Sequence, residues 1–214
     1  MLGKCIIFDL DGTLTDSGEG ILNSVEMTLR HFNLPVPERQ ALRVFIGPPL
    51  RDIFIEHGVP VDRAEEAIAV YRSRYNTIGK FENYPYPGIP QLLEKLRNEG
   101  YHLSVATSKP EHTAVEIMEK FQLAEYFEEI CGGTPDGSRD EKSKVIAYLL
   151  SKFNHSDRIW MVGDTDFDVI GAAAHGIPTI GVSWGYGNVK SMINSGAISI
   201  ANSVAELYDT LSKL

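Results

Sequence analysis

The sequence has little cysteine and no long apolar run, and these absences exclude several classes of protein. Its 214 residues include only two cysteines, Cys5 and Cys131, with no Cys-x-x-Cys pair or Cys/His cluster. We therefore expect two buried thiols, and neither a disulfide framework nor a zinc site. No segment approaches the roughly 20 apolar residues of a membrane helix, and the apolar residues 5–8 lack the features of a signal peptide. The sequence predicts a cytoplasmic protein with no membrane partner.

An excess of positive charge is also missing. The chain carries 29 acidic and 20 basic residues, which gives a net charge of −9. Nucleic acid would be repelled by most of such a surface, so we expect no nucleic-acid partner. An apolar content of 43% and a charged content of 23% are ordinary for a globular protein of one or two domains. As an assembly we expect a monomer or a homodimer.

Short, continuous apolar runs alternate with helical patterns along most of the chain. Continuous runs, as opposed to alternating ones, indicate a parallel sheet that is covered on both faces. One helical stripe contains Ile89, Leu92 and Leu96, and Gly100 follows it as a helix-ending glycine. The sequence therefore predicts a doubly wound, mostly parallel α/β domain. The expected strands cover residues 4–10, 102–107, 127–131, 159–163, 178–182 and 197–201.

The segment between residues 18 and 79 contains no convincing strand. Its apolar residues recur at helical spacing, with one stripe running from Ala64 through Tyr71 and Tyr75 to Ile78. We therefore expect a helical insertion after the first strand. The predicted domains are an α/β core of residues 1–15 and 82–214 and a helical domain of residues 16–81, with hinges at residues 16–20 and 80–88.

The first strand ends in two aspartates, Asp9 and Asp11, followed by Gly12 and Thr13. Residues i and i+2 of a strand point the same way, so the two carboxylates project together. Like charges at a buried strand end are costly without compensation, which indicates a cation and chemistry at this point.

Three later segments also place polar groups beyond apolar runs or at helix starts. In doubly wound sheets, ligands bind beyond the carboxyl ends of the strands, where the strand order reverses. These segments are Thr107-Ser108-Lys109-Pro110, residues 136–142 and Gly163-Asp164-Thr165-Asp166-Phe167-Asp168.

In order and spacing, the four segments resemble the four motifs of the haloacid dehalogenase-like phosphohydrolases, and the resemblance covers nearly the whole chain. The helical insertion is similar to the small helical cap of the phosphoglycolate phosphatase and β-phosphoglucomutase subgroup. Residues 132–146 and 176–187 resemble most the phosphoglycolate phosphatase and bacterial 5′-nucleotidase branch. The resemblance implies a Rossmann-like core.

The resemblance also implies separate roles for the first two aspartates. Asp9 would be the nucleophile, because a carboxylate can attack phosphorus and form an aspartyl-phosphate. Asp11 would be the general acid that protonates the leaving oxygen and then the base that activates water. Dehalogenases of this fold lack the second aspartate, so its presence favours phosphoryl chemistry.

A Mg²⁺ site follows from the same resemblance. Mg²⁺ prefers six oxygen ligands with few carboxylates. Asp9, the backbone carbonyl of Asp11 and Asp164 would supply three of them. Asp168 would hold a metal-bound water or orient Lys142, or it would simply complement the helix dipole.

The resemblance assigns phosphate contacts to the second and third segments. Thr107 would donate to a phosphoryl oxygen and Ser108 would offer its backbone N–H, although Thr107 could instead cap the helix that begins near residue 110. Lys142 would balance the charge of the phosphoaspartate. The sequence departs here from the commoner Lys-Pro pattern, so Lys144 competes for that role.

The remaining candidates lie in loops. Gly12 would allow a positive φ or a close approach, and Thr13 would bind phosphate or stabilise the turn. In the cap loop of residues 45–51, Gly47 would allow close approach to the site, and Arg51 would contact substrate or remain a surface residue. Trp184 and Tyr186 either border the site or cover the sheet edge.

The sequence thus predicts a Mg²⁺-dependent phosphatase acting on a small phosphorylated metabolite, of the phosphoglycolate or 5′-nucleotide type. An acidic chain must then build its anion site locally, from the metal, a lysine and backbone N–H groups. A phosphomutase similar to β-phosphoglucomutase is the alternative, and a non-catalytic protein that binds phosphate esters is a further one.

Overall fold

The computed structural model describes residues 3–47, 49–134, 136–153 and 158–214. The chain forms two compact units. Met1–Asp16 and Pro85–Leu214 make up an α/β unit, and Ser17–Tyr84 make up a helical unit. The two segments that connect them include β2 (Thr15–Asp16) and β3 (Tyr84–Pro85), which pair as a two-stranded sheet.

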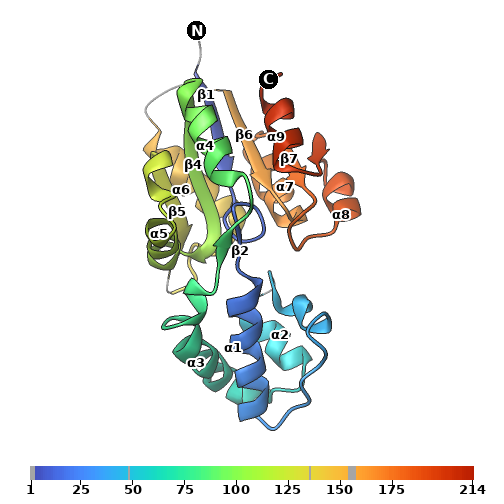
Figure 1. Cartoon of the computed structure of the whole chain (residues 1–214). Coiled ribbons are helices and arrows are strands. Elements are labelled where there is room, and N and C mark those ends of the chain that lie inside the picture. Colours follow the sequence, from blue (N-terminus) through green and yellow to red (C-terminus); the bar gives the residue numbers. More distant parts are fainter. Residues whose placement is uncertain (1–2, 48, 135, 154–157) are drawn as a thin grey trace. The chain divides into compact units, whose positions relative to one another are not determined.

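The α/β unit is built on a six-stranded sheet with the order β5-β4-β1-β6-β7-β8 (Figure 1). Every neighbouring pair is parallel, and at the end of β1 Phe8 lies opposite Val105 and Val162. The chain leaves β1 toward β4 and β5 and later adds β6, β7 and β8 on the other side, so the strand order reverses at β1. The strands are β1 (Lys4–Phe8), β4 (Tyr101–Pro110), β5 (Glu129–Gly133), β6 (Arg158–Gly163), β7 (Thr179–Val182) and β8 (Ser199–Ala201).

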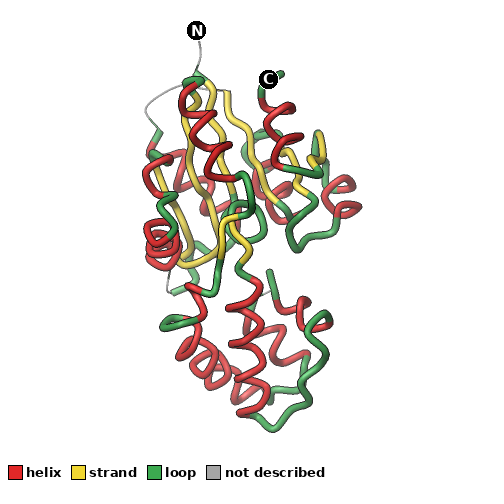
Figure 2. The backbone as a smooth tube through the Cα atoms, in the orientation of Figure 1, coloured by secondary structure: helices red, strands yellow, loops and turns green. Residues whose placement is uncertain are grey.

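Helices cover both faces of this sheet (Figure 2). Side chains alternate along β1, so Ile6 and Phe8 pack into a core with α4, α5 and α9, whereas Cys5 and Ile7 pack into a core with α6 and α7. The predicted doubly wound α/β fold with a helical insertion after β1 is confirmed. The helices are α4 (Ile89–Asn98), α5 (Glu111–Lys120), α6 (Lys142–Lys152), α7 (Asp166–Ala173), α8 (Val189–Asn194) and α9 (Val204–Leu211).

Both cysteines are buried thiols, as predicted. Burial raises the pKa of Cys131 to about 11, which keeps its thiol protonated at neutral pH and unreactive. Cys5 and Cys131 belong to the same apolar core, beneath α6 and α7. They act as small apolar side chains.

The helical unit has its own apolar core. It consists of α1 (Gly18–His31), α2 (Leu50–Glu56) and α3 (Ala64–Tyr75), with short 3₁₀ turns at Ala41–Phe45, Val61–Arg63 and Gly79–Phe81. The core includes Val25, Leu29, Phe54 and Tyr71.

One detail of the predicted helical stripe is wrong. The stripe was expected to continue to Ile78, but α3 ends at Tyr75 and Ile78 is 57% exposed. After α3 the chain turns, and the Gly79 backbone packs against Gly20 of α1. A Cβ on Gly20 would lie 1.8 Å from the Gly79 carbonyl oxygen. The helix thus ends shortly before this close backbone contact.

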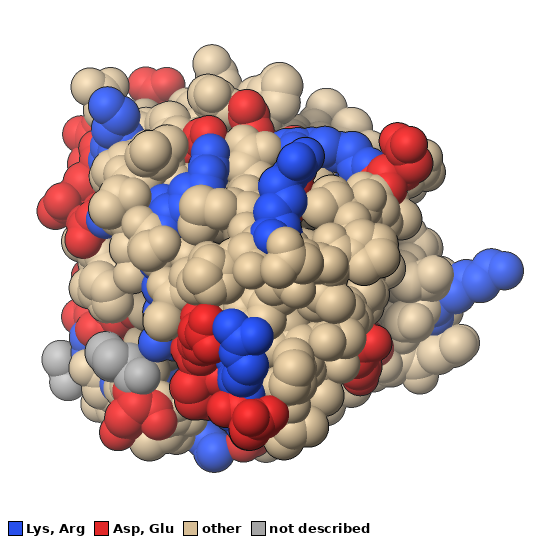
Figure 3. All heavy atoms as spheres, turned by 90° about the horizontal axis from the view of Figure 1, so that it is seen from below, with Lys and Arg blue, Asp and Glu red and all other residues tan. Residues whose placement is uncertain are grey.

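The surface of the protein carries charges of both signs. On the face drawn in Figure 3, acidic and basic side chains are interspersed among uncharged ones. Within the part of the chain that the structure describes, no helix is long and apolar enough to cross a membrane.

Candidate active site

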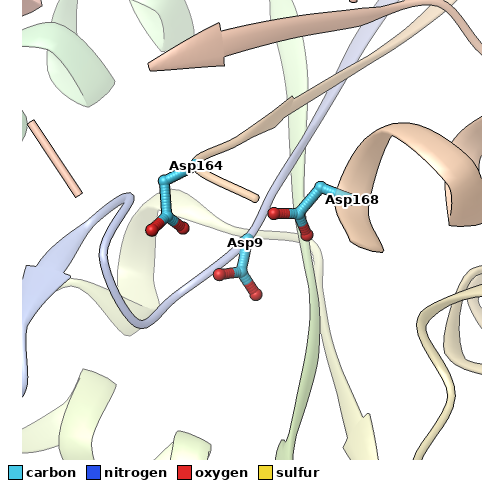
Figure 4. Close-up of side chains that lie close together, drawn as sticks. All are labelled: Asp9, Asp164 and Asp168. Carbon is cyan, nitrogen blue, oxygen red and sulfur yellow. The ribbon is translucent and has the colours of Figure 1, made fainter. Parts of the chain in front are cut away.

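Three carboxylates meet where β1 and β6 end. Asp9 follows β1 directly, Asp164 follows β6 directly, and Asp168 lies in the first turn of α7 (Figure 4). All three residues are buried, and one oxygen atom from each lies within 4.8 Å of the other two. The site therefore lies at the end of β1, where the strand order of the sheet reverses. Ligands of doubly wound sheets bind at this position.

The chain after β1 folds back sharply. The expected strand continued to Leu10, but it ends at Phe8 because the Leu10 carbonyl accepts hydrogen bonds from the N–H groups of Thr13 and two following residues. Gly12 has φ +89°, and a Cβ there would lie 2.3 Å from Oδ2 of Asp164. Only glycine combines this backbone conformation with so close an approach to the carboxylate.

Protein donors surround Asp164. Thr13 Oγ1 donates to Oδ1 at 3.1 Å, and the backbone N–H of Tyr186 donates to Oδ2 at 2.8 Å. A Cβ on Gly185 would lie 2.3 Å from the same Oδ2. The backbone of the glycine-rich segment after β7, residues 185–187, therefore packs directly on Asp164. Trp184 Nε1 donates to the Thr13 carbonyl. Trp184 and Tyr186 thus border the site, and the Thr13 hydroxyl is used within it.

Lys142 is the buried cation of the cluster. Its Nζ lies 2.5 Å from Asp9 Oδ1, 2.9 Å from Asp168 Oδ1 and 2.9 Å from the Ala106 carbonyl oxygen. The competing Lys144 is half exposed and pairs with Glu141. The geometry therefore places Lys142, at the first position of α6, against the carboxylates.

Asp168 is held by protein groups at both oxygens. Its Oδ2 accepts from the N–H of Thr165 at 3.0 Å and from the Thr165 hydroxyl at 2.8 Å, which makes a capping box at the start of α7. Its Oδ1 faces Lys142. Asp168 thus contacts both groups that its expected protein roles involve, the start of α7 and the lysine.

The segment at the end of β4 adds a second buried lysine that the sequence interpretation missed. Thr107 is buried, and its Oγ1 accepts from the backbone N–H of Lys109 at 3.2 Å. Lys109 Nζ lies 2.6 Å from Oδ1 of Asp11. Ser108 is exposed, and α5 starts after Pro110 with no side-chain cap, so Thr107 does not cap this helix. The spacing Thr107 to Lys109 was the available signal, since residues i and i+2 of a strand share a face.

Residues 6–182 match the model of the haloacid dehalogenase-like hydrolase family. The chain belongs to this family. It is 42% identical over 211 residues to the tyrosine-protein kinase PtkA of Mycobacterium tuberculosis, covering 97% of this chain and 72% of the relative. It is 42% identical over 185 residues to a 5′-nucleotidase of Pseudomonas aeruginosa, covering 86% and 84%. The crystal structure of a predicted phosphatase from Clostridium acetobutylicum, 43% identical, superposes over 100% of both chains with a TM-score of 0.92. The predicted family and its hydrolase class are confirmed.

The electrostatics of this haloacid dehalogenase-like hydrolase show an excess of buried negative charge. Burial raises the pKa of Asp9 to about 8, because the neighbouring carboxylates add to the effect and the Lys142 ammonium only partly opposes it. Burial also raises the pKa of Asp164 to about 6, with a further rise caused by Asp168. Burial by itself lowers the pKa of Lys142, but Asp168 and Asp9 outweigh it and hold that pKa above its ordinary value.

A divalent cation bound to the cluster would oppose both of these carboxylate shifts. Three ionised carboxylates and one ammonium leave two negative charges uncompensated in a buried space. A divalent ion would balance them, and carboxylate oxygens are the ligands that hard cations prefer. The residues present therefore fit a divalent metal site in this hydrolase.

The predicted cap residues have different surroundings. Gly47 has φ +111°, and apart from its chain neighbours no described residue has an atom within 4 Å of the position a Cβ would take. Arg51, at the start of α2, pairs with Glu65 at 2.5 Å. Both belong to the helical unit, and Pro48 between them lies outside the described residues.

Proposed function

We propose that the protein is a Mg²⁺-dependent phosphatase that hydrolyses a small phosphomonoester through an aspartyl-phosphate on Asp9. The observation that carries this proposal is the position of Asp9, a buried carboxylate at the end of the central strand, between Lys142 and two further carboxylates. Family membership supports the reaction class. The neighbouring Asp11 supplies the second carboxylate that such a reaction needs.

Asp9, Asp164 and the backbone carbonyl of Asp11 would hold the metal ion, with Asp168 reaching it only through water. This division follows from the contacts of Asp168, whose oxygens are already engaged by Thr165 and the lysine. When bound, Mg²⁺ would screen the repulsion between the nucleophilic carboxylate and the anionic substrate.

The chain's own residues would then carry both half-reactions. A carboxylate oxygen of Asp9 forms a bond to phosphorus while the bond from phosphorus to the leaving oxygen breaks, and Asp11 gives that oxygen its proton. In the second half-reaction, water attacks phosphorus, Asp11 takes a proton from the water and the bond to Asp9 breaks. The Thr107 hydroxyl and the Lys142 ammonium stabilise the phosphoryl oxygens throughout.

We propose a 5′-nucleotide as the first substrate class to test and phosphoglycolate as the second. The similarity to the Pseudomonas 5′-nucleotidase supports this order. The helical unit would select the leaving group, with Gly47 allowing close approach and Arg51 contacting the substrate after it leaves Glu65. The expected partner is thus a small phosphorylated metabolite.

The deciding experiment measures phosphate release from AMP, UMP, phosphoglycolate and sugar phosphates, with Mg²⁺ and with EDTA. Asp9→Asn should lower turnover by about 10⁴-fold or more, because the nucleophile is lost. The matched control is Asp209→Asn, the same change at an exposed site on α9. An Asp9→Asn protein that keeps more than a hundredth of parental turnover would contradict the proposal.

A second candidate is transfer of the phosphoryl group to a tyrosine hydroxyl instead of water, favoured by the similarity to PtkA over 97% of the chain. Incubation with γ-labelled ATP and a tyrosine-containing acceptor separates the two, because a kinase would leave label on tyrosine. The proposed phosphatase would leave tyrosine unlabelled and release phosphate from AMP. The phosphomutase alternative predicts an isomerised sugar phosphate with little free phosphate. A protein that only binds phosphate esters would give neither.

A further inference from the structure

We propose that Lys109 is a positioning residue of the hydrolytic reaction, which holds both the Asp11 carboxylate and the Thr107 hydroxyl in place. The inference rests on the proposed function, and it adds a residue that links the first and second motifs. Two separate contacts of Lys109 carry it, one made by the side chain and one by the backbone.

The side-chain contact is buried. The Lys109 side chain is only 6% exposed, although lysine normally keeps its ammonium in water, and its Nζ lies 2.6 Å from Oδ1 of Asp11. The Asp11 side chain is 21% exposed, so its carboxylate is more open than the ammonium that it contacts. A charge-assisted hydrogen bond of this length fixes the orientation of the carboxylate, which leaves its other oxygen to act.

The backbone contact orients the neighbouring hydroxyl. The N–H of Lys109 donates to Thr107 Oγ1 at 3.2 Å, so the hydroxyl oxygen already accepts a hydrogen bond. A threonine hydroxyl has one hydrogen to donate, and this contact leaves that hydrogen for another acceptor. Thr107 is thereby prepared to donate to a phosphoryl oxygen.

The backbone of β5 holds this segment in place. The pairing of β4 with β5 shifts register between Ala106 and Pro110, as at a β-bulge, which re-aims the side chains of the bulged strand. Glycines of β5 approach the bulge closely, since a Cβ on Gly132 would lie 2.5 Å from the Lys109 carbonyl oxygen. The backbone of Lys109 therefore packs directly on the neighbouring strand β5.

The two carboxylates that end β1 thus have separate lysines. Lys142 contacts Asp9, which attacks phosphorus, and Lys109 contacts Asp11, which moves the proton. Loss of Lys109 should therefore impair proton transfer to the leaving oxygen and leave the nucleophile in place. An alkoxide leaving group needs that proton, whereas p-nitrophenolate leaves with little help.

The test compares kcat/KM for AMP and for p-nitrophenyl phosphate, because kcat/KM reports the step in which the leaving group departs. In Lys109→Met we expect about a tenfold or larger loss with AMP and a clearly smaller loss with p-nitrophenyl phosphate, since a misplaced catalytic group costs up to ~100-fold. Lys109→Arg should restore part of the AMP activity. Asp11→Asn should show the same dependence on the leaving group.

Two further variants separate positioning from general damage. Lys120→Met makes the same change at an exposed site on α5 and should leave both rates unchanged. Gly132→Ala displaces the Lys109 segment without changing charge and should again reduce AMP hydrolysis more than p-nitrophenyl phosphate hydrolysis. Gly132→Ala thus provides the test if Lys109→Met does not fold.

Equal losses with the two esters, or no loss in Lys109→Met, would overturn the positioning role while the proposed phosphatase function stands. If the unmodified protein hydrolyses neither p-nitrophenyl phosphate nor any ester of the panel with Mg²⁺, the proposed function fails and this inference fails with it. If it hydrolyses another ester of the panel but not AMP, that ester takes the place of AMP in the comparison.

Discussion

The most deeply buried ion pairs among the described residues lie in the α/β unit, whereas the ion pairs of the helical unit are more exposed. In the α/β unit, the side chains of Lys142 and Asp9 are only 6% and 9% exposed, and Lys109 is as deeply placed against Asp11. In the helical unit, the arginine and glutamate of the Arg51–Glu65 pair are 45% and 77% exposed. The same type of ion pair therefore occurs in two environments that give it different energies.

The difference indicates where function has shaped the protein. An exposed ion pair contributes little to stability, because water solvates both charges almost as well as the partner does. A buried pair loses that hydration, and its cost is seldom recovered by attraction alone. Buried charges gathered beside a strand end are thus better explained by chemistry than by stability.

The largest expected effect comes from removing the buried ammonium. Lys142→Met leaves Asp9 and Asp168 without their cation, and we expect the free energy of unfolding to fall by about 3–5 kcal/mol. Urea unfolding in EDTA measures it at pH 8.5, where the carboxylates of the unfolded chain are ionised. Lys144→Met makes the same change at the surface and should leave the urea midpoint unchanged. Equal shifts in the two variants would remove the distinction between the buried and exposed pairs.

The pH dependence of stability should report the buried carboxylates of the α/β unit. The pKa of Asp9 is raised to about 8 and that of Asp164 to about 6 in the folded protein, so the folded state binds these protons more tightly than the unfolded chain. Their contribution to stability is complete below about pH 4 and is lost as the pH rises through these values. Without metal, the melting temperature should therefore fall between pH 5 and 8 for this reason.

If these carboxylates hold Mg²⁺ as proposed, Mg²⁺ should reverse this loss, because a metal ion binds them in their deprotonated form. The increase in melting temperature on adding Mg²⁺ should accordingly grow from pH 5 to 8. Asp9→Asn should weaken both trends. A Mg²⁺ effect that shrinks as the pH rises would argue against a metal site formed by these carboxylates.

A smaller effect is expected from the glycine beside the metal site. Gly185→Ala would place a Cβ 2.3 Å from Oδ2 of Asp164, so the carboxylate or the segment must move. We expect Mg²⁺ affinity to fall by about 10–100-fold, as for other changes to groups that support metal ligands. Titration calorimetry measures it. Gly176→Ala is the control, since its positive φ strains the chain but nothing lies within 4 Å of the new Cβ.

The smallest effect is expected at the surface of the helical unit. In a double-mutant cycle, Arg51→Ala and Glu65→Ala should couple by less than about 1 kcal/mol. If Arg51 contacts the substrate as proposed, Arg51→Ala should raise KM, while Glu65→Ala frees the arginine and leaves KM unchanged or lower. Steady-state kinetics with AMP measure this. A coupling energy of several kcal/mol would show that the Arg51–Glu65 pair stabilises the helical unit and would contradict this prediction.

Much of the fold was predictable because local patterns carry it. Continuous apolar runs identified all six strands of the main sheet, and helical spacing identified the insertion. The ends were less predictable, since the Leu10 carbonyl turns the chain after β1 and a contact between Gly20 and Gly79 forms near the end of α3. Such ends depend on hydrogen bonds and contacts that no local pattern encodes.

The candidate site was predictable where spacing brings groups together. Asp9 and Asp11 are neighbours on one strand, and Asp164 follows another strand of the same sheet. The roles of side chains that meet only in space were not predictable. Lys109 reaches Asp11 across 98 positions of sequence, and Thr13 reaches Asp164 across 151.

The sequence by itself determined the α/β class, the helical insertion, the family and the strand ends at which polar groups gather, because apolar periodicity and motif spacing are local properties of the chain. Only the tertiary structure decided how the charges are shared, with Lys142 on Asp9 and Asp168, Lys109 on Asp11, and Lys144 and Arg51 at the surface. The physical reason is burial, since the pKa of a carboxylate and the energy of an ion pair depend on which atoms replace water.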